Sequence, residues 1–506
     1  MNHEMTLGLL ILIPAFAGFA CLLMPSLRTA LGLMCAGVFG TAIIGLFAIT
    51  SVLFEHHILY AAGQWLFMDA LSAYNYFVML LIFCLSSIYS CVYFRAEMEH
   101  HNLTINQIRL FTCLWCEALT AMTIVLLSNN LGIMWVGIEA TTLITAFLIC
   151  VHVSRESLEA MWKYILICSV GVAFAFMGTL LAAASAKGVA FGNHNALLWT
   201  TLRTNAAALN PTLIKAAFIF LLVGYGTKAG LAPMHTWLPD AHSQAPAPVS
   251  AIFSGFMLNA ALYCVMRYVP IVETATGNSS WGLNLIAGFG IISIMTAAVF
   301  ILFQTDLKRL LAYHSIEHLG IIALGLGLGG LGTFAALFHT LNHSLCKTLS
   351  FFAAGRLGQA IGGSHDMEKM NGSMRISPVW GIGIFCSILA LIGIAPFALF
   401  ISEFQLLKAA IDKGATVSLV LFLLGAGIVF IGALGHAIPL AWGRPHSTAP
   451  VSRASFVEFI LVFAPLSILL LLGIWMPQPL QSALNASADV IRNTVSASAS
   501  LQGGLP

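Results

Sequence analysis

Five charged side chains lie deep inside apolar stretches of this sequence. They are Glu117, Glu139, Lys228, Lys347 and Glu403. One such charge at the centre of a bilayer costs about 3 kcal/mol, so five unpaired charges would cost roughly 15 kcal/mol, as much as the whole stability of a folded domain. We therefore expect each group to pair, to be hydrated or to change its protonation state. Intramembrane groups of this kind are typical of ion paths.

A second set of ionisable side chains recurs every four residues along one predicted helix. His339, His343 and Lys347 share a helical face, and Glu317 and His318 lie in the preceding apolar stretch. Histidine titrates near neutral pH, which suits a proton wire. Two histidines at this spacing could also bind zinc, but no glutamate follows the first one and the sequence offers no third ligand. Histidines that are simply packed in the core are the remaining alternative.

Glu139 is surrounded by small residues, in the run WVGIEATT over residues 135–142. Small side chains let membrane helices approach closely, so we expect Glu139 to pair with Lys228 of another helix. The carboxylate would then control whether the lysine keeps its proton, and separating the pair would release that proton toward the next group. A static buried salt bridge is the alternative.

Two predicted helices, the seventh and the twelfth, are broken by similar segments, GLAP at 230–233 and GIAP at 393–396. Lys228 precedes the first break and Glu403 follows the second. Proline frees backbone groups that lipid cannot satisfy, so each break must face protein or a water-filled cavity. Broken helices beside intramembrane charges are typical of transport sites. Lys408 either pairs with Glu403 or extends to the membrane interface, and we favour the interface.

The composition requires membrane-spanning helices to carry these residues. Of the 506 residues, 59% are hydrophobic and 8% are charged, whereas a soluble domain carries about 25% charged residues. Apolar runs of about 20 residues, the length that crosses a bilayer, predict an all-α polytopic membrane protein with about fourteen spans. The expected spans are 7–24, 30–54, 69–94, 109–128, 131–151, 160–186, 212–231, 249–270, 281–303, 312–329, 334–355, 378–400, 416–440 and 455–476.

Basic residues are unevenly distributed between the loops on the two sides of these spans. Loops rich in Lys and Arg stay in the cytoplasm, and together with the even number of spans this bias places both termini outside the cytoplasm. The side with more basic residues holds Arg28, Arg95, Arg109, Arg155, Lys163, Lys308, Arg309, Arg356, Lys369, Arg375, Arg444 and Arg453, and the other holds Lys187, Arg203, Arg267, Lys413 and Arg492.

The two breaks lie five spans apart, so the segments that contain them begin on opposite sides of the membrane. We therefore predict two inverted five-helix repeats, spans 4–8 and 9–13. The chain then divides into an N-terminal three-helix segment (1–108), a first repeat (109–270), a second repeat (271–440), and a C-terminal helix with a short polar tail (441–506). The tail after Pro477 is rich in Ser and Ala, and we expect it to be frayed.

Two motifs carry a resemblance to a known family. Lys228 with HTWLPDAH over residues 235–242 resembles the seventh-helix motif of the antiporter-like subunits of respiratory complex I. That superfamily also includes Mrp-type sodium/proton antiporters and membrane subunits of energy-converting hydrogenases. The run DLKRLLAYHS over residues 306–315 is similar to a further family motif, although its charges, Asp306, Lys308 and Arg309, could be solvated loop residues that cap helices. The resemblance implies the inverted repeat and essential roles for Lys228 and for a glutamate at Glu139.

Asn259 departs from the family pattern. In many complex I subunits a lysine in the eighth span bridges the two half-paths, whereas asparagine can hold water but cannot carry charge. Water, Tyr263 or the tenth-span residues must then form the bridge. Asparagine here is similar to the hydrogenase-4 component F type and to formate hydrogenlyase subunits. The intramembrane ionisable groups and the resemblance together predict a proton path through Glu117, Glu139, Lys228, His235, Asn259, Glu317, His318, His339, His343, Lys347 and Glu403.

The sequence offers no binding motif for a redox cofactor. Its eleven cysteines are scattered through apolar runs, and the CxxC pair Cys113 and Cys116 lies in an apolar helix, where packing explains it better. Iron–sulfur, NiFe or flavin groups are therefore expected only in partner subunits, which would include other membrane subunits and a cytoplasmic electron-transfer arm. No basic tract indicates nucleic-acid binding.

Three functions remain. The first is a proton-translocating subunit of a redox-driven respiratory or hydrogenase complex in a bacterial or archaeal cytoplasmic membrane. The second is a cation/proton (Na⁺/H⁺) antiporter subunit of an Mrp-like complex. The third, a membrane scaffold, conflicts with the cost of the buried charges. Asn259 and the short C-terminal tail favour the first.

Overall fold

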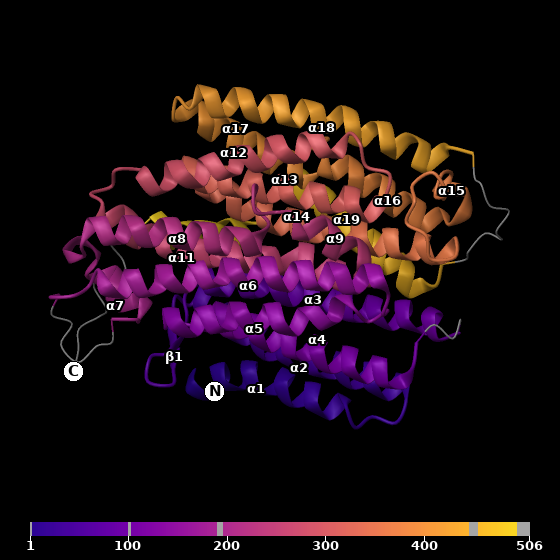
Figure 1. Cartoon of the computed structure of the whole chain (residues 1–506), viewed down its shortest axis with the longest axis horizontal. Helices are drawn as coiled ribbons and strands as arrows, with labels where there is room; N and C mark the ends of the chain where they lie inside the picture. The colour runs from indigo at the N-terminus through magenta and orange to yellow at the C-terminus, as the bar shows by residue number, and fades with distance from the viewer. Residues whose placement is uncertain (1–2, 100–102, 190–195, 445–453, 493–506) are drawn as a thin grey trace.

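The computed structural model describes residues 3–99, 103–189, 196–444 and 454–492. Most helices lie side by side along the long axis of the molecule, with the hairpin β1–β2 and α7 at one end and α15 at the other (Figure 1). The elements are α1 (His3–Cys21), α2 (Leu27–Phe54), β1 (Leu59–Ala61), β2 (Leu66–Met68), α3 (Ala70–Glu99), α4 (Ile105–Leu127), α5 (Leu131–Ile149), α6 (Arg155–Ala184), α7 (Trp199–Thr204), η1 (Ala206–Ala208), α8 (Pro211–Ala229), α9 (Trp237–Gln244), α10 (Ala247–Ile252), η2 (Phe253–Met257), α11 (Leu258–Ala275), α12 (Trp281–Ile301), α13 (Leu307–Leu328), α14 (Leu331–Ala360), α15 (Ser373–Ile376), α16 (Pro378–Leu391), α17 (Ala398–Asp412), α18 (Thr416–Trp442), α19 (Phe456–Ile474) and α20 (Gln478–Arg492).

Helices occupy every predicted span position. Within the described residues, twelve helices are long and apolar enough to cross a membrane, so the chain is a multi-pass membrane protein. Two predicted spans are not among the twelve. The eleventh is α14, which is 30 residues long but carries the histidine and lysine stripe. The twelfth is divided between α16 and α17, of 14 and 15 residues. The count of fourteen spans therefore remains a prediction.

Side-chain caps determine where several helices begin. Ser26, Thr104, Ser154 and Ser455 each accept a hydrogen bond from the third amide of the helix, and the side chain at that position bonds back to the cap. Such a capping box satisfies first-turn amides that have no partner within the helix. The helix ends are thus specified locally by the sequence, independently of the apolar stretches.

The predicted break in the seventh span lies between α8 and α9. Gly230 ends α8 with φ of +77°, which glycine adopts readily. The freed amide of Ala232 donates to Ser293 Oγ of α12 at 2.9 Å, so neighbouring protein satisfies it, as expected. Pro233 itself is exposed on the surface of the chain. The second break lies between α16 and α17 and has Gly393 at φ of +67°.

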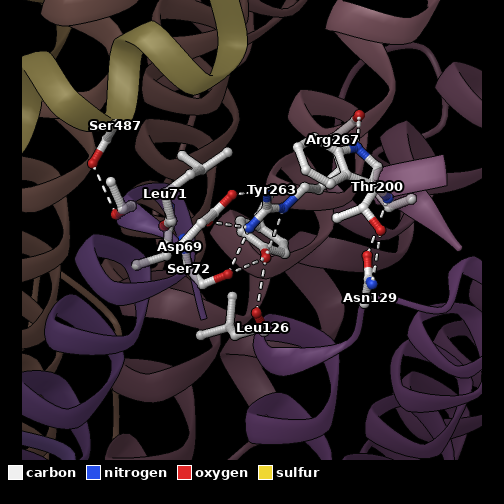
Figure 2. A network of polar contacts seen from close by, with 12 residues as sticks. Asp69, Leu71, Ser72, Leu126, Asn129, Thr200, Tyr263, Arg267 and Ser487 are labelled. Atoms are coloured by element: carbon white, nitrogen blue, oxygen red, sulfur yellow. Dashed lines mark hydrogen bonds and ion pairs between the residues drawn. The ribbon is translucent and has the colours of Figure 1, made fainter. Parts of the chain in front are cut away.

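A buried ion pair joins the hairpin end to α11 (Figure 2). Asp69 directly follows β2, which pairs antiparallel with β1, and accepts hydrogen bonds from Arg267 at 2.6 and 2.7 Å. Tyr263 OH accepts from Arg267 Nε at 2.8 Å and donates to the carbonyl of Leu126 at 2.8 Å. The prediction that Arg267 lies in a loop is wrong. It lies within α11 and is 1% exposed, because Asp69 compensates its charge.

The prediction of a frayed tail is also wrong for residues 478–492, which form α20. The helix packs against α3, α11 and α14, and Ser487 Oγ donates to the carbonyl of Ala70 at 3.0 Å (Figure 2). Residues 493–506 of the predicted tail, and Arg453 of the predicted loops, lie outside the described residues. The spacing of the buried residues is helical, which was a usable signal. They are Ala483, Leu484, Ser487, Ala488 and Ile491.

Candidate functional site

Lys228 lies in the last turn of α8, directly before the first break, and its side chain is completely buried. Its Nζ donates to Thr142 Oγ1 of α5 at 2.9 Å and to Tyr164 OH of α6 at 2.5 Å. Nζ also lies 4.7 Å from the centre of the Tyr164 ring, whose face attracts a cation. Two neutral hydroxyl groups and an aromatic ring therefore hold the lysine nitrogen.

Glu139 does not form the expected direct pair with Lys228. Within the described residues no ion pair of 4 Å or less joins the two. Glu139 Oε1 accepts a hydrogen bond from Ser169 Oγ of α6 at 2.9 Å, and its buried Oε2 has no hydrogen-bond partner there. Thr142 lies one turn after Glu139 on α5 and holds the lysine instead. Glu139 and Lys228 thus both bond to side chains of α6, Ser169 and Tyr164, and the static salt bridge is not observed among the described residues.

The predicted histidines form a buried cluster between α13, α14 and α17. His318 Nδ1 and His339 Nε2 lie 2.9 Å apart, and His339 Nδ1 lies 2.8 Å from Ser402 Oγ of α17. On the preceding turn of α13, His314 Nδ1 lies 2.9 Å from Glu317 Oε2. All five side chains are 4% exposed or less. A continuous set of hydrogen-bonding groups therefore connects α13 to α17 through α14.

His343 and Lys347 complete the stripe on α14. The His343 ring lies 5.1 Å from the His318 ring, and within the described residues neither of its nitrogens has a hydrogen-bond partner. Lys347 Nζ donates to the carbonyl of Leu311 of α13 and lies 5.1 Å from the centre of the Phe351 ring. The stripe thus faces α13, and the prediction that these residues share a buried face agrees with the structure.

Glu403 lies at the α17 side of the histidine cluster. Its carboxylate and the ring nitrogens of His318 and His339 lie within 4.8 Å of one another. Oε2 is packed so closely against Gly393 of the second break that a Cβ there would collide with it. A third potential metal ligand, which the sequence did not reveal, is therefore present. However, His318 Nδ1 and His339 Nε2 already bond to each other.

Amide and hydroxyl groups lie on η2 and at the start of α11, and these two elements pack against α14 and α8, respectively. Asn259 Nδ2 donates to Ser344 Oγ of α14 at 3.2 Å, and its buried Oδ1 has no hydrogen-bond partner among the described residues. Ser254 Oγ of η2 lies 2.7 Å from Ser315 Oγ of α13. η2 is a π-helical turn, a feature frequent at functional sites. Tyr263, a candidate bridge in the sequence, instead belongs to the ion-pair network at the hairpin end.

Two predicted path residues lie apart from these contacts. Glu117 of α4 packs against α1, where a Cβ on Gly18 would lie 2.7 Å from its Oε1. His235 lies in the first break, with its ring 6.4 Å from those of Phe300 and Tyr313. Within the described part of the chain, no hydrogen bond or ion pair connects either residue to Lys228 or to the histidine cluster.

Sequence reasoning missed the hydroxyl groups that hold the ionisable side chains. They are common in membrane helices, so their presence carries little signal. Position along the helix was the only clue, because Thr142 follows Glu139 by one turn and Ser402 directly precedes Glu403. The missed groups are Thr142, Tyr164, Ser169 and Ser402.

The multi-pass bundle, its two broken helices and its buried ionisable groups define an antiporter-like membrane subunit. Residues 128–429 match the family described as NADH:quinone oxidoreductase/Mrp antiporter, TM. The chain belongs to this family, which confirms the predicted resemblance.

Individual proteins that are similar to this chain include two hydrogenase-4 components and one chain of an archaeal respiratory complex. Hydrogenase-4 component F homolog of Methylacidiphilum infernorum is 37% identical over 388 residues, which cover 75% of this chain and 80% of the relative. Hydrogenase-4 component B of Escherichia coli is 27% identical over 464 residues, covering 86% of this chain and 66% of that protein. A chain of the membrane-bound sulfane sulfur reductase, an archaeal respiratory membrane complex, has the same fold, with a TM-score of 0.84 at 24% identity over 96% of this chain and 97% of that chain.

Proposed function

We propose that this chain translocates protons as a membrane subunit of a redox-driven respiratory or hydrogenase complex. The observation that carries the proposal is a row of ionisable and hydrogen-bonding groups across the bundle, which is buried except for the half-buried Glu139 and Glu403. It begins at Glu139 and Lys228, continues past Asn259, and ends in the histidine cluster and Glu403. The remaining members of the proposed path are Glu317, His318, His339, His343 and Lys347. Glu117 and His235 have no assigned step.

The groups suit stepwise proton transfer. An imidazole can accept a proton on one nitrogen and release one from the other, and His318 and His339 are already hydrogen-bonded. Buried polar atoms without protein partners are usually satisfied by water, so Asn259 Oδ1 and the His343 nitrogens mark where water completes the row. Glu139 would set the protonation of Lys228 and so start each transfer.

We also propose the full architecture of the family for this chain. α14 and the pair α16–α17 complete fourteen crossings, and the breaks that contain Gly230 and Gly393 lie in corresponding positions of two inverted repeats, within 109–270 and 271–440. Residues 1–108 and 441–506 flank the repeats. The distribution of basic residues supports a cytoplasmic α15 end, with both termini on the other side of a bacterial or archaeal cytoplasmic membrane.

Electron transfer is assigned to partner subunits. The names of two relatives call them components of a hydrogenase. We therefore place this chain beside other membrane subunits and a cytoplasmic electron-transfer arm, where iron–sulfur, NiFe or flavin groups would reside. The family description also includes Mrp antiporters. A Na⁺/H⁺ antiporter subunit without a redox partner is therefore the second candidate.

One experiment separates the two candidates. The chain is purified with its companion proteins, reconstituted in liposomes, and supplied with the electron donor that those companions oxidise. We expect redox-dependent acidification of the lumen, reported by a pH-sensitive dye, in buffers free of Na⁺. Acidification only in exchange for Na⁺, with no redox-active companion in the complex, would support the antiporter instead.

Replacement of Asn259 by lysine tests whether the middle of the proposed path must be uncharged. A third cation between Lys228 and Lys347 repels both, so we expect the pumping rate to fall on the order of tenfold, equivalent to about 1.4 kcal/mol in the barrier. The measurement is the initial rate of acidification per assembled complex. Asn259→Gln keeps the amide and serves as the control. An unchanged rate in the lysine variant would mean that protons cross elsewhere.

A further inference from the structure

Two imidazoles and one carboxylate from three different helices meet in the histidine cluster. His318 of α13, His339 of α14 and Glu403 of α17 each offer one ligand atom, and these atoms lie within 4.8 Å of one another. Within the described residues, one other group of three such side chains lies as close, His314, Glu317 and His318, and it shares His318. Two nitrogens and one carboxylate oxygen are a set of ligands that Zn²⁺ takes in proteins, with water in the fourth position.

The hydrogen bonds around His339 decide which of its nitrogens is free to bind a metal. Ser402 Oγ donates to the carbonyl of Leu399 at 2.8 Å, so it accepts the hydrogen of His339 Nδ1, which lies 2.8 Å away. His339 Nε2 therefore carries the free electron pair, and it faces His318 Nδ1. Histidines that bind a metal are usually held in this way, by a hydrogen bond from the other ring nitrogen.

The spacing of the two nitrogens is close to that of a zinc site. His318 Nδ1 and His339 Nε2 lie 2.9 Å apart, whereas two nitrogens bound to a tetrahedral zinc ion by bonds of about 2.0 Å lie about 3.3 Å apart. A small outward shift of one ring would admit the ion. The hydrogen that His318 Nδ1 now shares with His339 would then move to His318 Nε2.

Buried nitrogens without hydrogen-bond partners surround the same place. His318 and His343 are fully buried, and their rings lie 5.1 Å apart. Among the described residues, His318 Nε2 and both nitrogens of His343 have no hydrogen-bond partner. Burying such a nitrogen without a partner is costly. A ligand that engages these imidazoles would relieve part of that cost, and His343 would be an alternative to water in the fourth position.

Two carboxylates near the ligand atoms can balance the charge of a divalent ion. Glu403 would bind the ion directly, and Glu317 lies next to His318 and bonds to His314. A dication with two carboxylates is neutral as a unit, and charges inside a protein must be balanced in this way. Imidazole ligands favour Zn²⁺ over Mg²⁺ and Ca²⁺, which prefer oxygen ligands.

A polar cavity of about 690 Å³ at the α15 end also contains histidines, but among its described residues no group of three ligands lies this close. Lys308 lines this cavity. The interpretation of Lys308 as a solvated loop charge is wrong, because it is 2% exposed and its Nζ donates to the carbonyls of Ser243 at 3.2 Å and Ala245 at 2.5 Å. Asp306 does cap α13, by accepting from the amide of Arg309 at 2.9 Å. A buried ammonium disfavours a second cation beside it.

We propose that His318, His339 and Glu403 form a binding site for Zn²⁺, and that the bound ion stops proton translocation through the histidine cluster. Its effect on translocation rests on the proposed function, whereas binding itself does not. The ion would occupy the electron pairs through which the two imidazoles exchange protons, and its charge would oppose a proton on Lys347 of the same stripe. It would also tie α17 to α13 and α14 beside the second break.

Zinc binding to the whole complex tests the site. The complex is purified with its companion proteins, stripped with a chelator and dialysed against radioactive zinc. We expect the parent to bind one ion more per complex than the Glu403→Gln and His339→Gln variants do. His436→Gln on α18 is the matched control and should bind as the parent does, since His436 bonds to the Ile301 carbonyl outside the group of ligands. Equal zinc stoichiometry in the parent and both ligand variants would overturn the proposal.

X-ray absorption at the zinc edge identifies the ligands if those variants do not assemble. The zinc that the stripped parent complex takes up should show nitrogen and oxygen ligands at about 2.0–2.1 Å, with the scattering of imidazole rings. Sulfur ligands at about 2.3 Å would place the ion on cysteines instead and would refute the site.

Inhibition by zinc is measured in the vesicle assay. Zn²⁺ at a saturating concentration should lower the redox-dependent acidification rate of the parent at least about tenfold, and a chelator should restore it. Ser402→Ala removes the acceptor that orients His339, so its zinc dissociation constant and its half-inhibiting zinc concentration should both rise at least about tenfold. That parallel shift ties inhibition to this site rather than to a partner subunit. A zinc-loaded parent that pumps at the full rate would refute the blocking role, whereas a zinc-free parent that never acidifies the vesicles would refute the proposed function.

Discussion

We expect the replacement of Lys228 by alanine to abolish the proposed redox-driven proton translocation while the complex still assembles. The lysine is buried at the first break, and among the described residues its Nζ is held by Thr142, by the hydroxyl of Tyr164 and by the ring of Tyr164. Without the lysine, the proposed path loses the amine that exchanges protons at this position. We expect the initial rate of acidification to fall at least about 100-fold, the scale on which a lost proton-transfer group acts.

Two further variants separate proton transfer from packing at this position. Glu139→Gln keeps the shape of the side chain and the bond to Ser169 but removes the charge, so translocation should also be lost. Thr142→Val removes one hydroxyl bond to the lysine and leaves both ionisable groups, so only a partial loss is expected. Normal pumping by Lys228→Ala or Glu139→Gln would show that the assigned roles are wrong.

Replacement of Arg267 by methionine lowers the stability of the chain by about 3–5 kcal/mol, because it leaves the Asp69 carboxylate buried without its partner. All eleven cysteines are buried or half-buried, so a thiol-reactive dye reports thermal unfolding of the complex in detergent. The double variant Asp69→Asn with Arg267→Met removes both charges and should recover much of the loss. Equal melting temperatures for the parent and the single variant would contradict this assignment.

The same ion pair predicts an acid sensitivity. Burial alone would raise the pKa of Asp69, but the charge and hydrogen bonds of Arg267 outweigh it and lower the pKa below its usual value. A carboxylate whose pKa is lower in the folded protein than in the unfolded chain stabilises the fold at pH values above its unfolded pKa, about 3.9. This stabilisation is lost as the pH falls through the pKa of the folded protein. The melting temperature of the parent should therefore drop below about pH 4, and that of the double variant should drop less.

Intramembrane charge was the most informative property of the sequence. Lys228, Lys347 and the histidine stripe could be predicted because a charge in an apolar run is too costly to be incidental. The breaks could be predicted from glycine and proline. Helical periodicity then placed His339, His343 and Lys347 on one buried face, as the structure has them.

Pairing between distant segments could not be predicted in the same way. Asp69 and Arg267 are 198 residues apart in the sequence, and Arg267 sits near the end of a predicted span, where basic residues usually belong to loops. The partner of Lys228 was misassigned for a related reason. Both Glu139 and Thr142 lie on the correct helix, and only the packing of α5 against α6 and α8 selects the hydroxyl as its hydrogen-bond partner.

The neutral amide of Asn259 affects the electrostatic repulsion between charges in the two halves of the bundle. Since it stores no charge, excess charge can reside only on the α8 side or on the α14 side of it. Two cations separated by neutral, poorly polarisable matter repel far more strongly than they would in water. In the proposed path, a proton held on one side would therefore disfavour a second proton on the other side, and this repulsion would make the protonation of the two halves alternate.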